Sequence, residues 1–186
     1  MKKIVIIAAM ALMCFSAYAQ KLARVNFSEL VQLMPEADQA RATLKAVSQE
    51  AEETLQTMYS EYQTKMTQYQ QKSASWSDVI KKSKESELMD IQRRIEENQQ
   101  AFQQEIQQKQ NELMAPIYEK AQKVVKDLAK AKGVTALFDN SSALYFDEAA
   151  VEDLTAEARK ALNIPADRTL EALQAELAAE QQAQQK

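Results

Sequence analysis

The chain has 186 residues, and its 23 basic and 27 acidic residues give it a net charge of −4 at pH 7. It contains no His, one Gly and one Cys, which argues against imidazole catalysis, zinc sites and Gly-rich phosphate loops. The abundance of Ala, Gln, Glu and Lys favours a few long helices.

The first twenty residues have the pattern of a secretory signal peptide. Lys2 and Lys3 form a positive start, residues 4–15 are uncharged and largely apolar, and Ala17-Tyr18-Ala19 has the small-x-small pattern of a cleavage site. We expect residues 1–19 to be removed by cleavage between Ala19 and Gln20, so the mature protein is expected to be secreted.

Cys14 raises the alternative of a lipoprotein signal. Met13 precedes it where a small residue is expected, so plain secretion is favoured. Removal of residues 1–19 takes away two lysines and the only cysteine. The mature chain then has 21 basic and 27 acidic residues, a net charge of −6, and no thiol chemistry.

An apolar seam along residues 37–69 predicts the outgoing helix of a hairpin. Before it, Leu22–Phe27 predicts a short strand within a body segment, 20–34. The seam residues follow one another in steps of three and four, the spacing of a coiled coil. They are Ala37, Ala40, Leu44, Val47, Ala51, Leu55, Met58, Tyr62, Met66 and Tyr69. We expect 35–132 to form a coiled-coil arm.

The arm is expected to reverse at a tip near residues 72–84. The cluster Ser73–Asp78 is the one place between the seams where the chain could turn. Ser75 and Asp78 have capping-box spacing, and Ala74 and Val79 stand at the positions of a hydrophobic staple. Residues 72–84 also carry a net charge of +3 in an otherwise acidic chain.

A second seam predicts the returning helix. It comprises Leu88, Ile91, Ile95, Phe102, Ile106, Leu113, Ile117, Val124, Leu128 and Ala131. Polar residues interrupt it at Asn98/Gln99 and at Lys109/Gln110. Pro116 lies inside this helix and should remove a hydrogen bond and kink it, which makes it a candidate hinge. Gly133 is expected to end the helix in a left-handed conformation.

Short strands are predicted after the arm, in a closing body segment, 133–162. The candidates are 134–138 and 143–146, joined by a turn at 139–142, and a helix near 153–162 follows. A sheet of three short strands cannot enclose a core, so an oligomer is expected. The tail 163–186 is Ala/Glu/Gln-rich and is expected to be a frayed helix or disordered.

The two ends of the arm carry a family resemblance. Residues 22–30 (LARVNFSEL), followed by Pro35-Glu36, are similar to the opening of the Skp/OmpH family, and residues 137–145 (LFDNSSALY), followed by Asp153-Leu154-Thr155, resemble its closing part. The resemblance covers 22–162. It implies a mostly α protein with a small β body and a long antiparallel hairpin arm, assembled as a jellyfish-like homotrimer.

The resemblance also implies a function. Members of the family are periplasmic chaperones that hold unfolded outer-membrane proteins (their clients) between the arms without ATP, and they have no catalytic residue, metal or cofactor. The best-known members are strongly basic, whereas the mature chain here is acidic. The residues expected in the oligomeric body are Leu22, Val25, Phe27, Leu137, Phe138, Leu144 and Tyr145.

The tip admits two interpretations. Trp76 with Lys81, Lys82 and Lys84 could contact a client or, transiently, a membrane surface. Alternatively, Trp76 covers the end of the hairpin and the lysines are merely solvated. Tyr59 lies off the seam and is a further surface candidate.

An acidic chain does not fit nucleic-acid binding. The alternative function is a coiled-coil spacer or adaptor of the cell envelope.

Overall fold

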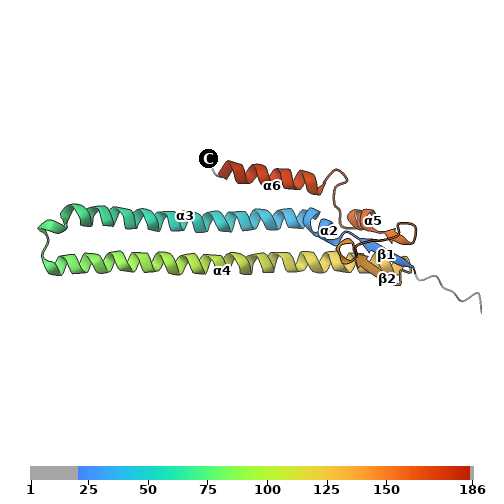
Figure 1. The fold of residues 1–186 in the computed structure, drawn as a ribbon, viewed down its shortest axis with the longest axis horizontal. Helices are drawn as coiled ribbons and strands as arrows, with labels where there is room; N and C mark the ends of the chain where they lie inside the picture. Colours follow the sequence, from blue (N-terminus) through green and yellow to red (C-terminus); the bar gives the residue numbers. More distant parts are fainter. Residues whose placement is uncertain (1–20, 185–186) are drawn as a thin grey trace, which may run out of the picture. The chain divides into compact units, whose positions relative to one another are not determined.

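The computed structural model describes residues 21–184, so the expected signal peptide and its cleavage site lie outside the described residues. Its elements are shown in Figure 1. In chain order they are β1 (Leu22–Val25), α2 (Phe27–Leu33), α3 (Pro35–Lys72), η2 (Ser73–Ser75), α4 (Asp78–Ala131), β2 (Ala136–Asp139), η3 (Asn140–Ser142), β3 (Val151–Asp153), α5 (Thr155–Ala161) and α6 (Leu170–Gln184). The expected class, mostly α with a small three-stranded sheet, is confirmed. No helix within residues 21–184 is long and apolar enough to cross a membrane.

The chain divides into two compact units. One, the arm, is Pro35–Ile117; the other, the body, comprises residues 21–34 and 118–184 of the described chain. In the arm, α3 and the first part of α4 run antiparallel beside each other (Figure 1). Pro35 stands at the first position of α3, where its missing N–H leaves no helical bond unmade. α4 (Asp78–Ala131) continues as one helix through Pro116.

The body contains a parallel sheet in the order β2-β1-β3. Arg24 of β1 lies opposite Phe138 of β2 and Asp153 of β3. Because side chains alternate along a strand, Ala23 and Val25 share the opposite face, and both are buried. β1 is the central strand, and within residues 21–184 β2 and β3 each have one unpaired edge.

The prediction of a strand at 143–146 is wrong. These residues form an exposed loop, and the third strand is β3, with Val151 buried. The loop ends in a turn at Asp147, whose carboxylate accepts the backbone N–H of Ala149 and whose carbonyl accepts that of Val151, both over 3.0 Å. Because the turn follows the apolar residues 143–146, the segment that pairs with β1 is Val151–Asp153.

Two helices in the body end in the same way. Gly133 has φ +68, and the backbone N–H groups of Gly133 and Val134 bond to the carbonyls of Lys130 and Ala129 over 3.0 and 2.9 Å. This is a Schellman motif, and it confirms the predicted left-handed stop after α4. Asn163, with φ 57, repeats the arrangement after α5, with bonds to Lys160 and Arg159.

The predicted seams face inward through most of the arm. Every member of the first seam, and of the second seam up to Ile117, is buried or half-buried. The buried cluster is formed by Met58, Ile91 and Ile95, with Tyr62 packed against it. Beyond Ile117 the buried positions differ from the predicted seam residues Val124, Leu128 and Ala131. The buried residues there are Ala121, Val125 and Ala129, and Ala131 is exposed. There α4 belongs to the body and no longer follows the coiled-coil spacing.

The tail forms an ordered helix, α6. Leu173 of α6 is buried, and α6 contacts α2. Arg159 ties the connection down, because its Nη2 donates to the carbonyls of Pro165 and Arg168 over 2.9 and 2.5 Å. Its Nη1 pairs with Glu29 of α2 over 2.5 Å. The tail is thus helical over residues 170–184.

Candidate functional site

The arm tip is built around Tyr69 and Trp76. Their rings meet edge to face, with centroids 5.9 Å apart, and Trp76 is half-buried. The helix α4 is capped by Ser77, whose hydroxyl faces the N–H of Ile80 at 3.5 Å, so the predicted cap at Ser75 is wrong. Trp76 thus has a packing partner, Tyr69, within the hairpin end.

The predicted staple at the tip is also absent. Val79 is 80% exposed and Ile80 is 45% exposed. Neither residue belongs to the predicted second seam, which begins at Leu88. The tip thus presents two apolar side chains to solvent beside its lysines.

The tip lysines differ in their partners. Lys84 pairs with Glu87 over 2.8 Å, and Lys81 lies 3.9 Å from Asp78. Lys82 is exposed and has no ion-pair partner within residues 21–184. Hydrogen bonds from Lys65, across the hairpin, and from Lys84 lower the pKa of Glu87 to about 2. The positive charge that remains free at the tip is therefore concentrated on Lys82 and on Lys72.

A groove lies between α3 and α4 next to the buried cluster of the arm. It is lined by Tyr59, Tyr62, Gln63, Gln92, Ile95, Glu96 and Gln99. Its apolar part is Ile95, which is 5% exposed. The amide of Gln99 donates to the hydroxyl of Tyr59 over 2.7 Å. The sequence identified Tyr59 as a surface candidate but did not pair it with Gln99.

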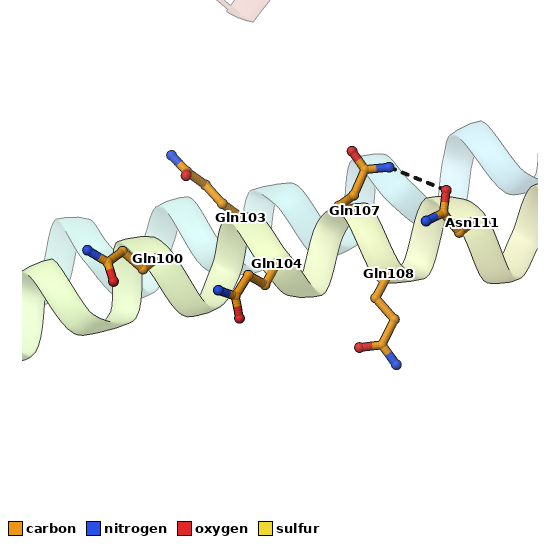
Figure 2. A pocket seen from close by; sticks show the side chains of 6 residues that line it. All are labelled: Gln100, Gln103, Gln104, Gln107, Gln108 and Asn111. Atoms are coloured by element: carbon orange, nitrogen blue, oxygen red, sulfur yellow. Dashed lines mark hydrogen bonds between the residues drawn. The ribbon is translucent and has the colours of Figure 1, made fainter.

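Further along α4 lies a stripe of primary amides, the amide stripe. Figure 2 shows its side chains, Gln100, Gln103, Gln104, Gln107, Gln108 and Asn111. Gln107 and Asn111 form a hydrogen bond of 3.3 Å. No charged residue belongs to the stripe, although charged residues make up 27% of the chain. It is a neutral surface with many hydrogen-bond donors and acceptors.

One face of the body sheet carries an exposed apolar loop. Arg24 pairs with Asp153 over 3.2 Å and lies 6.0 Å from the centre of the Phe146 ring. Phe146 also contacts Phe138, with ring centroids 6.4 Å apart. Phe138 is 39% exposed, Tyr145 is 79% exposed and Leu144 is fully exposed. A single chain leaves these large side chains uncovered.

The remaining predicted site residues are distributed as follows. Val25 is buried, and Leu22, Phe27 and Leu137 are half-buried. Phe27 packs against Tyr118, with ring centroids 6.2 Å apart. Pro116 is exposed and lies one residue before the end of the arm. Within residues 21–184 no group of acidic side chains is arranged to hold a metal ion.

Comparison with known proteins places this architecture. The family model described as outer membrane protein (OmpH-like) matches residues 21–162. The chaperone protein Skp of Yersinia enterocolitica is 28% identical over 145 residues, which cover 78% of this chain and 87% of that protein. The Skp of Pectobacterium atrosepticum is 26% identical over 142 residues, covering 76% and 85%.

A solved structure shows the same fold. The crystal structure of an OmpH-like protein from Caulobacter crescentus CB15 matches with a TM-score of 0.68 at 14% identity, over 79% of this chain and 85% of that one. The family match includes the arm and most of the body and ends before α6. By this match over most of its length, the chain belongs to the OmpH-like outer membrane protein family.

Proposed function

We propose that this chain is an ATP-independent periplasmic holdase chaperone. It binds unfolded outer-membrane proteins between helical arms and prevents their aggregation. The observation that carries the proposal is the family match over residues 21–162. The relatives of this chain in Yersinia enterocolitica and Pectobacterium atrosepticum are chaperones named Skp. The hairpin arm fits this role, because a holdase needs a long surface with many weak contacts. The proposal assigns no catalytic step, metal or cofactor to the chain.

The assembly proposed is a homotrimer formed through the body. It is supported by the two unpaired sheet edges and by the exposed side chains of Leu144 and Tyr145. Large exposed apolar groups beside open edges favour association. Leu22, Val25, Phe27, Leu137 and Phe138 complete the proposed body. Three arms would then enclose one cavity for the client.

The tip is proposed as the place of first contact with a client. The ring of Tyr69 packs against that of Trp76 and covers part of it. The groups left for a client are therefore Lys81, Lys82 and Lys84, together with the exposed side chains of Val79 and Ile80. These offer charge and apolar surface at the end of the arm. A transient contact with a membrane surface would use the same groups.

The test is light scattering of an unfolded outer-membrane β-barrel protein diluted from denaturant. With no nucleotide present, a stoichiometric amount of this chain should suppress the rise in scattering. The second candidate function, a structural spacer of the cell envelope, rests on the coiled-coil arm alone. A spacer would leave the scattering unchanged, and that result would overturn the chaperone proposal.

A further inference from the structure

The groove between α3 and α4 combines an apolar base with aromatic walls, which suits the side chain of a bound polypeptide. Its apolar part is Ile95, in the buried cluster of the arm, and Tyr62 packs against that cluster. Tyr59 is 39% exposed and is held at the groove by the bond from Gln99. An aromatic side chain inserted here could pack against two tyrosine rings and an isoleucine. Glu96 is the one charged residue of the lining.

The amide stripe continues from this groove along α4. Gln99 lines the groove, and Gln103 follows it by four residues, which places the two side chains one turn apart on the same side of the helix. Gln107 extends the same line by another turn (Figure 2). The groove therefore adjoins the part of the amide stripe that Gln103 and Gln107 form.

The amides of the stripe have unused hydrogen-bonding capacity. Within the described residues, Gln100, Gln103, Gln104 and Gln108 have no intramolecular partner for their side chains, and Gln107 and Asn111 share one bond. A primary amide offers two donors and one acceptor, which complement the N–H and C=O groups of a peptide. An extended segment has unpaired groups of this kind along its length. The stripe thus fits a polypeptide backbone without regard to its charge.

We propose that the groove and the amide stripe together form a binding track for an extended polypeptide segment that carries an aromatic side chain. The aromatic group enters the groove beside Tyr59, and the backbone lies along the glutamines. The inference rests on the proposed chaperone function and names the client feature that the arm recognises. Transmembrane β-strands supply it, since they alternate apolar and polar residues and carry aromatic girdles.

The test uses the full chain and two fluorescently labelled peptides of alternating Thr and Val. One peptide has a central Tyr and the other has Leu at that position. Fluorescence anisotropy should show that the Tyr peptide binds more tightly, by roughly twofold to tenfold, the range expected for aromatic pairs. Tyr59→Ala should abolish this preference and leave the Leu peptide unaffected. Tyr59→Phe, which keeps the ring but loses the bond from Gln99, should retain part of the preference.

The stripe is tested separately. A Gln103→Ala/Gln107→Ala double variant should weaken both peptides equally, because it removes backbone contacts. The matched control is Gln56→Ala/Gln68→Ala, two glutamines of α3 that lie outside the track. Met89→Ala controls for loss of an exposed apolar group, since Met89 is 63% exposed. All variants should keep the circular dichroism spectrum of the original chain.

The track would be overturned if the preference for the Tyr peptide survived Tyr59→Ala. It would also be overturned if Gln56→Ala/Gln68→Ala lowered peptide affinity as much as Gln103→Ala/Gln107→Ala. Failure of the track and failure of the chaperone function give different results. If the original chain suppresses aggregation but shows no aromatic preference, the track is wrong and the chaperone function stands. If the chain fails to suppress aggregation, the proposed function is lost whatever the peptides show.

Discussion

The side chain of Gln99 donates a hydrogen bond to the hydroxyl of Tyr59 over 2.7 Å and joins the two helices of the arm. It lies where polar residues interrupt the second seam. Beside it, Met58, Ile91 and Ile95 form the buried cluster. From residue 96 to residue 116 of α4 no side chain is fully buried. The bond therefore marks a change from apolar packing to half-exposed contacts along the arm.

The buried cluster should dominate the stability of the arm. Ile91 is 2% exposed, so Ile91→Ala removes well-packed methyl groups and should lower the free energy of unfolding by about 2–5 kcal/mol. Urea denaturation followed by far-UV circular dichroism measures the change. Met89→Ala, at a neighbouring exposed position, should stay within about 0.5 kcal/mol of the original chain. Equal losses in both variants would contradict the cluster's role.

The ion-pair network below the tip should make the stability of the arm depend on pH. Hydrogen bonds from Lys65 and Lys84 lower the pKa of Glu87 from 4.5 to about 2. Because the folded pKa is the lower one, this stabilisation is present above pH 4.5 and is lost as the pH falls towards 2. Thermal unfolding at a series of pH values should show this loss. Glu87→Gln should flatten the curve in this window, whereas the exposed control Glu53→Gln should not.

The helical hairpin was predictable because its seams have a clear spacing of three and four residues. The third strand was not. Ala-Leu-Tyr-Phe at 143–146 has strand composition, whereas β3 contains the acidic pair Glu152 and Asp153. Glu152 is matched by Lys21 and Lys132, and Asp153 by Arg24. These partners come from distant parts of the sequence, so local composition could not reveal them.

The groove and its hydrogen bond escaped prediction for a similar reason. Tyr59 and Gln99 are 40 positions apart, and their pairing depends on the register of the two helices. That register follows from where the chain turns. The sequence placed the cap at Ser75, while the helix is capped by Ser77. Which side chains pair across the hairpin can therefore be identified only from the structure. The position of Tyr59 on the surface, in contrast, was predictable from the sequence.

Charge at the tip should contribute to client capture even though the whole chain is acidic. Reversal of Lys81, Lys82 and Lys84 to Glu should weaken binding of an unfolded outer-membrane protein at low salt. Added salt should also weaken binding to the original chain, since surface charges are screened over about 8 Å at physiological ionic strength. Titrations at two salt concentrations provide the measurement. Binding that withstands both changes would assign capture to apolar contacts and to the neutral track.

Pro116 should act as a hinge near the end of the arm. Its ring removes a backbone N–H from α4, and it lies one residue before the boundary between the arm and the body. Amides at 108–117 should therefore exchange with solvent faster than those of Ala23 and Val25 in the central strand. Pro116→Ala should narrow this difference and reduce the range of client sizes held. Equal protection of both regions in the original chain would exclude the hinge.

A substitution at Leu144 can distinguish association of the bodies from folding of the single chain. This side chain is fully exposed in the single chain, so Leu144→Asp should change the stability of the body by no more than about 0.5 kcal/mol. In the proposed trimer the same change would bury an unpaired charge, which is costly. Sedimentation velocity and native mass spectrometry should therefore show three chains for the original protein and single folded chains for the variant.

A suitable control for this experiment is Val79→Asp, which makes a similar change at an exposed apolar residue of the arm tip. It should leave the trimer intact, because the tip is not part of the proposed interface. Circular dichroism of Leu144→Asp should retain the helical signal, which distinguishes dissociation from unfolding. A trimer that persists in Leu144→Asp would show that the exposed loop lies outside the interface. A stable monomer of the original chain would remove the trimer, and with it the shared cavity between three arms.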